Sequence, residues 1–191
     1  PRLADAQQLF LYEPCGVLLG SGLASDDCAA AKLEELLSLP IGELQMLSEA
    51  GAPSGADATF LEARASEIAH RISVVAAVSK GYTSLENSRA RGAFTRAMEL
   101  ALGALGPFGA FSDVRAKTVT LLHRMVETFS LDVLGYLQPA LPHLLHTADA
   151  KDTADVASLL VQLVLKFKSA IASSISPVIA PMTAGIFSVS Y

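Results

Sequence analysis

Apolar residues recur at helical spacing along most of the chain, and this pattern constrains the fold more than any other feature. Between residues 87 and 105, apolar side chains fall at every third or fourth position, which gives a helix one continuous apolar face. The same spacing returns over residues 113–129 and 154–168. Alternation of apolar and polar residues, which indicates a half-buried strand, is almost absent. The sequence therefore predicts an all-α protein.

Breaker residues divide the 191-residue chain into about eight helical stretches. Turns rich in Gly, Pro, Ser or Asp are predicted near residues 20–27, 50–58, 81–87, 106–113, 147–153 and 172–176. A faint repeat links YLQPALPHLL at 136–145 with SISPVIAPMT at 174–183, an offset of 38 residues, and SLPIGELQML at 38–47 is a weaker third copy.

Recurring helix pairs of this length are typical of a HEAT-repeat αα superhelix, in which neighbouring pairs cover each other's apolar faces. We expect one array of about four pairs, over residues 4–49, 57–106, 112–147 and 153–190. The prolines of the repeat are expected to mark helix starts, because a first-turn proline loses no hydrogen bond. Pro14 is expected instead to kink or split its helix.

Gly81 follows the predicted helix that contains Ile68, Ile72 and Val75. A glycine at this place commonly ends a helix in the left-handed conformation, and such a turn would aim the next helix in a fixed direction. The alternative is that Gly81 is one loop residue among several.

Motifs for catalysis, nucleotide binding or metal binding are absent from the sequence. The glycines of GVLLGSG at 16–22 follow no predicted strand, so this segment is interpreted as a helix end and a turn. His143 and His146 share a helix face but lack a third ligand, which favours polar surface residues over a metal site. Cys15 and Cys28 form no CxxC pair and are expected to be small core residues. We predict a non-enzyme without a cofactor.

The final 23 residues, from Ser169, carry no charge but contain six Ser and two Pro, which is poor material for a membrane-spanning helix. They are interpreted as a helix that a further repeat would cover. Ile179, Met182 and Ile186 should then be exposed, and the chain should self-associate as its concentration rises. Because no initiating Met or leader sequence is visible, we expect a fragment of a longer protein.

Charge is distributed unevenly along the chain, whose formal net charge is −5. Residues 1–70 carry 3 basic and 11 acidic side chains, whereas residues 71–191 carry 11 basic and 8 acidic ones. From Arg64 to Arg124 there are nine basic and four acidic side chains. The chain as a whole should repel phosphate, so any contact with nucleic acid must be local.

Two basic pairs stand out because residues seven apart differ by only about 20° around a helix. Arg89 and Arg96 form the first pair, and Lys117 and Arg124 form the second. Adjacent helices of the array could place all four on one surface as a stripe that follows phosphates, to which Lys166 and Lys168 are weaker additions. The alternative is that these cations only solvate the outer faces of their helices.

Several strings carry a resemblance to a known family. RISVVAAVSKGYTSLENSRA at 71–90, VTLLHRMVETF at 119–129, YLQPALPHLL at 136–145 and VQLVLKFKSAI at 161–171 resemble the later HEAT repeats of the exportin-T family. LFLYEPCGVLLGSG at 9–22 resembles an earlier helix of the same region. The resemblance keeps its order over residues 9–187 and is greatest to plant-type members, with departures at Pro14 and around 50–58.

This resemblance implies a middle-to-C-terminal segment of a much longer karyopherin that moves between nucleus and cytoplasm. Such a receptor would bind tRNA together with Ran in its GTP form, would contact nucleoporins in the pore, and would not insert into membranes. The main Ran-binding repeats would lie near the N-terminus, outside this segment. The family offers no short motif for its tRNA contacts, so the six candidate cations rest on charge alone. The alternative function is a helical-repeat scaffold that binds proteins.

Overall fold

A computed structural model describes residues 5–51, 55, 57–86, 88–145 and 149–171. Within these residues the chain forms seven α-helices and two short 3-10 helices, and no strand. The helices are α1 (Asp5–Gly20), α2 (Asp26–Glu49), α3 (Ala58–Ser79), α4 (Arg91–Phe108), α5 (Ser112–Phe129), η1 (Ser130–Asp132), α6 (Val133–Leu145), α7 (Ala150–Phe167) and η2 (Lys168–Ile171). The predicted all-α helical-repeat class is confirmed.

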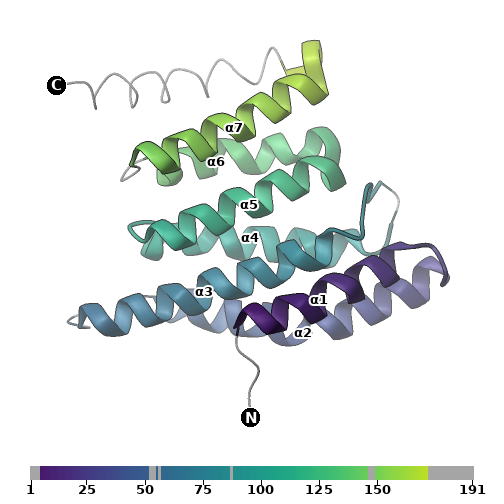
Figure 1. Ribbon diagram of the computed structural model, residues 1–191, viewed down its shortest axis with the longest axis horizontal. Helices are drawn as coiled ribbons and strands as arrows, with labels where there is room; N and C mark the ends of the chain where they lie inside the picture. The colour runs from purple at the N-terminus through teal and green to yellow at the C-terminus, as the bar shows by residue number, and fades with distance from the viewer. Residues whose placement is uncertain (1–4, 52–54, 56, 87, 146–148, 172–191) are drawn as a thin grey trace.

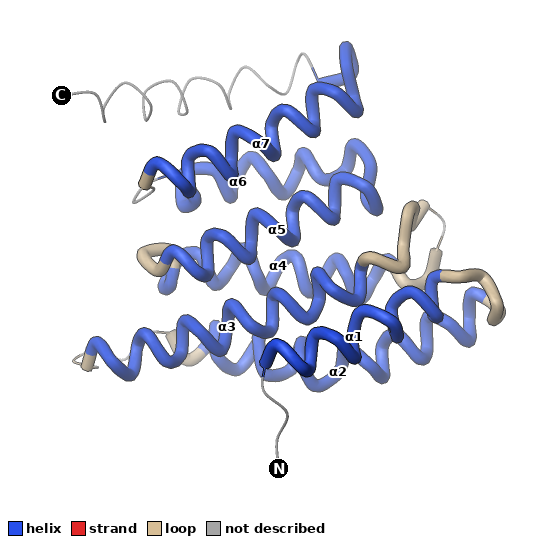
Figure 2. Tube along the Cα trace, in the orientation of Figure 1, coloured by secondary structure: helices blue, strands red, loops and turns tan. Residues whose placement is uncertain are grey.

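The helices are arranged in two layers (Figures 1 and 2). Helices α1, α3, α5 and α7 lie side by side in what we call the first layer, and α2, α4 and α6 form the second layer behind it. Each helix therefore packs against the helix two places along the chain. Helices α1 to α6 fall two by two on the first three predicted pairs, although α4 ends at Phe108, beyond residue 106; the boundaries of the pairs stay a prediction. Residues 172–190 of the fourth predicted pair, with Ile179, Met182 and Ile186, lie outside the described residues.

One apolar core runs between the two layers. Its largest fully buried side chains include Phe94, Phe108 and Phe129. The stripe predicted over 113–129 faces this core, because Val114 and Leu121 on α5 are completely buried. Helical periodicity therefore selected the packed faces of α4 and α5 correctly, whereas on α7 the predicted Val164 is 43% exposed. None of the described helices combines the length and the apolar character that crossing a bilayer requires.

The prolines of the repeat that the structure describes lie inside helices rather than at their starts. Helix α1 continues without a break through Pro14, and Pro40 lies well inside the 24-residue α2. Pro139 and Pro142 lie within α6. A proline removes one backbone hydrogen bond but does not end a helix whose flanking turns are held by packing, as Leu37 and Ile41 hold α2 around Pro40. The predictions that these prolines start helices, and that Pro14 splits one, are wrong.

Helices α1 and α3 approach each other so closely that glycine is required at the contact. A Cβ atom on Gly16 would lie 2.1 Å from the carbonyl oxygen of Val78, and one on Gly20 would lie 1.9 Å from that of Gly81. A Cβ atom on Gly81 would lie 1.9 Å from the carbonyl oxygen of Gly16. The backbones of the two helices thus touch directly.

The expected left-handed conformation of Gly81 is wrong, since the described glycines with positive φ are Gly22, Gly51 and Gly55. Gly81 has a packing role instead, because it gives the backbone of α1 room beside the end of α3. Of the glycines of GVLLGSG, Gly16 and Gly20 serve the same contact, whereas Gly22 has a positive φ and nothing within 4 Å of its Cβ position. Cys15 and Cys28 are exposed free thiols, so their expected place in the core is also wrong.

Candidate nucleic-acid interface

Ion pairs join the acidic beginning of the chain to the basic segment that follows it. The Nζ atom of Lys80 lies 2.6 Å from Glu13, and the Nε atom of Arg89 lies 2.8 Å from Asp27. Arg71 makes a third pair of this kind, 2.7 Å from a carboxylate on α2. The uneven charge of the sequence is therefore partly used within the fold, which leaves fewer cations for a ligand.

Arg89 and Arg96 both contact α2. The carboxylate of Asp26 accepts hydrogen bonds from the Ser88 hydroxyl at 2.9 Å and from the Arg89 backbone N–H at 3.1 Å. These bonds hold Arg89 in the turn before α4, so it does not belong to the predicted helix. Arg96 lies on α4 and donates from Nη2 to Oε1 of Gln45 at 2.5 Å. This predicted pair accordingly belongs to the second layer.

Lys117 and Arg124 lie on α5, in the first layer. Lys117 is exposed, and its side chain makes no hydrogen bond or ion pair with the described residues. Arg124 is half-buried, and its Nη2 atom donates to the carbonyl oxygen of Ser79 at 3.4 Å. Its Nε atom is buried without a hydrogen-bond partner. Of the candidate cations on α4 and α5, these two therefore make the weakest contacts within the fold.

The expectation that all four cations share one surface is wrong. Helix α4, which follows Arg89 and carries Arg96, lies in the second layer, whereas α5, which carries Lys117 and Arg124, lies in the first (Figure 1). The angle between two residues around a helix axis shows whether they share a face of that helix. It does not show how that helix lies relative to the next one. The structure brings Lys117 and Arg124 together on the first layer and separates them from Arg89 and Arg96.

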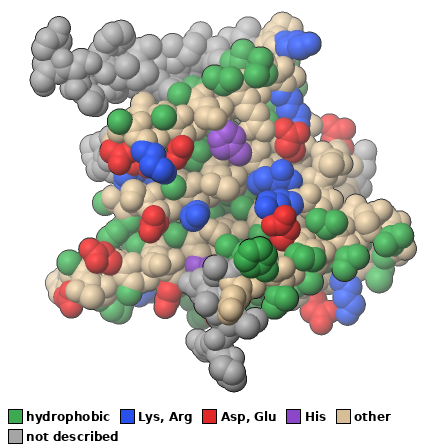
Figure 3. Space-filling view, in the orientation of Figure 1, with side chains coloured by type: hydrophobic (Ala, Val, Ile, Leu, Met, Phe, Trp, Pro, Cys, Tyr) green, Lys and Arg blue, Asp and Glu red, His purple; other side chains and the backbone are tan. Residues whose placement is uncertain are grey.

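Lys166 extends the basic side of the first layer onto α7. Its Nζ atom lies 2.7 Å from Oε2 of Glu127 on α5. This hydrogen bond, aided by one from Gln162 and opposed by partial burial, lowers the pKa of Glu127 below its ordinary value of 4.5. Lys168 follows α7 and is exposed, with a positive φ of 48°. Figure 3 shows basic side chains over the first layer with acidic side chains beside them.

The cations that were not selected from the sequence include Lys80, Arg91 and Arg115. Arg91 pairs with Asp132 at 2.6 Å, and its guanidinium lies 4.7 Å from the centre of the Phe129 ring. Arg115 is buried. The burial of Arg115 could have been predicted from its position on α5. It comes one residue after the core residue Val114 and three before the buried Thr118.

Arg115 joins three helices in the interior. Its Nε atom donates to Oδ2 of Asp152 at 3.0 Å, its Nη2 atom donates to the same oxygen, and its Nη1 atom donates to the carbonyl oxygen of Gly109 at 2.6 Å. Asp152 and Asp149 also form a capping box at the start of α7. The pair fixes α7 against α5 and the end of α4, so it stabilises the array and is inaccessible to a ligand.

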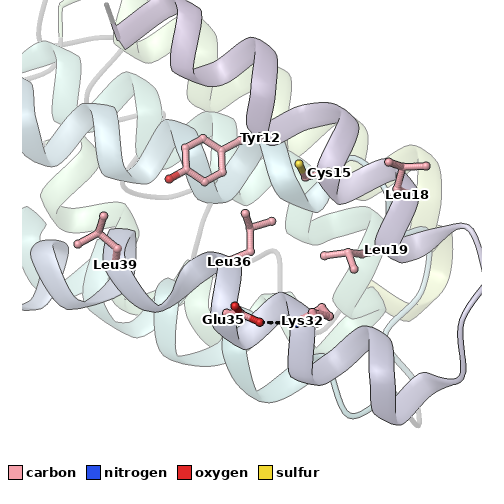
Figure 4. A pocket seen from close by; sticks show the side chains of 8 residues that line it. All are labelled: Tyr12, Cys15, Leu18, Leu19, Lys32, Glu35, Leu36 and Leu39. Atoms are coloured by element: carbon pink, nitrogen blue, oxygen red, sulfur yellow. Dashed lines mark hydrogen bonds and ion pairs between the residues drawn. The ribbon is translucent and has the colours of Figure 1, made fainter. Parts of the chain in front are cut away.

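An apolar groove of about 580 Å³ lies between α1 and α2 (Figure 4). Its lining comes from the sides of the two helices that face away from the rest of the array, and an ion pair of 2.7 Å between Lys32 and Glu35 lies at its edge. The groove residues are Tyr12, Cys15, Leu18, Leu19, Lys32, Glu35, Leu36 and Leu39. In the part of the chain that the structure describes, no three His, Cys, Asp or Glu side chains gather to hold a metal ion.

A comparison with protein-family models matches residues 4–190 to the Exportin-T model. The chain belongs to the Exportin-T family. Exportin-T of Arabidopsis thaliana is 28% identical over 185 residues, which cover 94% of this chain and 18% of that protein. Exportin-T of Danio rerio is 25% identical over 190 residues, or 98% of this chain and 20% of that protein. The chain therefore spans about a fifth of the length of these Exportin-T relatives.

Proposed function

We propose that this chain is a segment of a nuclear export receptor for tRNA. The observation that carries the proposal is its membership of the Exportin-T family over residues 4–190. The complete receptor would bind tRNA in a complex with Ran in its GTP form and carry it through the nuclear pore. It would contact nucleoporins on the way and would shuttle between nucleus and cytoplasm.

The segment would contribute binding rather than catalysis, since GTP hydrolysis would belong to Ran. Ran itself would contact mainly repeats outside residues 1–191. Proteins recognise double-helical RNA largely by its shape, through backbone phosphates and 2′-hydroxyl groups. Cations spaced along a layer of helices could each contact a different phosphate of such an RNA. We therefore assign the RNA-facing surface to the first layer, where Lys117 is exposed and Arg124 is weakly bound within the fold.

A comparison of two double variants in the full-length protein tests this assignment. Lys117→Gln/Arg124→Gln removes two cations from the first layer, and Arg89→Gln/Arg96→Gln removes two from the second. Both pairs change the net charge equally. Each phosphate contact contributes about 0.9 to the slope of log affinity against log salt concentration. The first variant should weaken tRNA binding and flatten this slope by about 1.8, whereas the second should change the slope little.

Thermal melting of both variants is the control for folding. Equal effects of the two pairs on tRNA affinity would mean that only the overall charge matters. A larger effect of Arg89 and Arg96 would place the RNA on the second layer. An unchanged salt slope in both variants would mean that all four residues only solvate the surface.

A protein-binding scaffold is the second candidate function, and the apolar groove between α1 and α2 favours it. Exposed apolar side chains gather on this part of the chain, among them Phe10, Leu11, Leu18 and Leu39. Exposed apolar patches commonly mark sites of protein contact. Substituting Leu18 and Leu39 with Ser in the full-length protein would distinguish the candidates. Loss of a protein partner with intact tRNA binding would support the scaffold.

A further inference from the structure

A row of five charged side chains, three basic and two acidic, crosses the first layer from α1 to α7. It consists of Glu13 on α1, Lys80 at the end of α3, Arg124 and Glu127 on α5, and Lys166 on α7, which we call the charge row. Lys80 Nζ lies 2.6 Å from Oε2 of Glu13, and Lys166 Nζ lies 2.7 Å from Oε2 of Glu127. Each lysine of the row is thus paired with a carboxylate from a neighbouring helix of the same layer.

The backbone contact between α1 and α3 sets one end of the charge row. Gly16 and Gly81 let the two helices touch, and Glu13 lies almost one turn before Gly16 on α1. This crossing brings Glu13 within reach of Lys80, although 67 residues separate them in the sequence. Arg124 adjoins Lys80, because it donates to the carbonyl oxygen of the preceding residue at 3.4 Å.

The pairs of the charge row are accessible to a ligand. The side chains of Lys80 and Glu13 are 46% and 45% exposed, and those of Lys166 and Glu127 are 30% and 43% exposed. Exposed ion pairs are weak and easily exchanged. The buried pair of Arg115 and Asp152, at 5% and 4%, could not exchange partners in this way. A phosphate that approached the first layer could therefore replace either carboxylate on its lysine.

We propose that the charge row binds the phosphate backbone of double-helical RNA, and that Glu13 and Glu127 compete with the phosphates for Lys80 and Lys166. This inference rests on the proposed function, because it names how that surface is regulated. In the absence of RNA the carboxylates hold the lysines, and in the complex the phosphates displace them. The two glutamates consequently weaken binding and make it easier to reverse.

Removal of the two competing carboxylates from the full-length protein tests the inference. The variant Glu13→Gln/Glu127→Gln keeps the shape of both side chains and frees both lysines. Its matched control is Glu35→Gln/Glu43→Gln, which raises the net charge equally and frees Lys32 and Arg71 around α2. Fluorescence anisotropy with tRNA, repeated over a series of salt concentrations, measures affinity and its salt dependence.

Because each exposed pair is weak, we expect the first variant to bind tRNA about three- to tenfold more tightly. In the wild-type complex the two displaced carboxylates take up cations from solution, which partly offsets the counterions that the phosphates release. The variant lacks these carboxylates, so its salt slope should be steeper by up to about 1.8, while the control should gain less than about twofold in affinity. The opposite change, Lys80→Gln/Lys166→Gln, should weaken binding and flatten the slope.

Each outcome has one meaning. Equal gains in the first variant and its control would overturn the inference, since general charge would then explain both. Unchanged binding after loss of Lys80 and Lys166 would also overturn it. If the wild-type protein binds tRNA but Glu13→Gln/Glu127→Gln changes the affinity no more than the control does, the inference alone fails. If wild-type protein does not bind tRNA at all, the proposed function fails and the inference fails with it.

Discussion

Replacing Gly81 with alanine tests whether direct backbone contact holds α1 against α3. The new Cβ atom would lie 1.9 Å from the carbonyl oxygen of Gly16 and 2.4 Å from its carbonyl carbon. Both are atoms of a helix backbone, so no side-chain rotation can relieve the overlap. The two helices would have to move apart until the shortest contact grows from 1.9 Å to at least 3.0 Å.

Overpacking of a well-packed site costs about 1–3 kcal/mol, and a rigid backbone neighbour places this variant at the upper end. For a chain of this size, about 3 kcal/mol corresponds to a fall of about 6–12 °C in Tm. Thermal melting followed by circular dichroism measures the shift. Gly103→Ala on α4 is the matched control, because nothing lies within 4 Å of its Cβ position.

The control should raise the stability by about 0.5–1 kcal/mol, because glycine is unfavourable inside a helix. Gly81→Asn separates packing from backbone conformation. Asparagine tolerates the left-handed region, so it would restore stability if Gly81 were needed for its φ angle. An unchanged Tm for Gly81→Ala, or a recovery in Gly81→Asn, would refute the packing explanation.

Two further predictions concern charged groups. Arg115→Met should lower the free energy of unfolding by about 3–5 kcal/mol, because Asp152 would stay buried without its partner. Chemical denaturation measures this loss, and Arg115→Met/Asp152→Asn should recover part of it. Glu127, whose folded pKa is lowered by its hydrogen bond with Lys166, should stabilise the fold above pH 4.5 and lose this contribution as pH falls through its folded pKa. Glu127→Gln should flatten the acid decline of Tm, and identical pH profiles would contradict this.

Much of the fold was predictable because helix formation depends on near neighbours. The spacing of Phe94, Met98 and Leu105 identified the buried side of α4, and the corresponding stripe on α5 was equally informative. The resemblance to the exportin-T family was also readable from short strings. Helix boundaries were less accurate, since Arg89 was expected inside a helix that begins at Arg91. The hydrogen bonds of Asp26, from another helix, decided that boundary.

The sequence by itself determined which residues face the core, because periodicity within one helix fixes which side of that helix is apolar. Tertiary structure decided which cations remain available. Arg89 and Lys80 meet carboxylates more than 60 residues away, and no local pattern reports such distant partners. The role of Gly81 was likewise decided by the backbone of α1. The role of a charged residue or a glycine depends on the side chain or backbone that it contacts, and those contacts form only when the helices pack into layers.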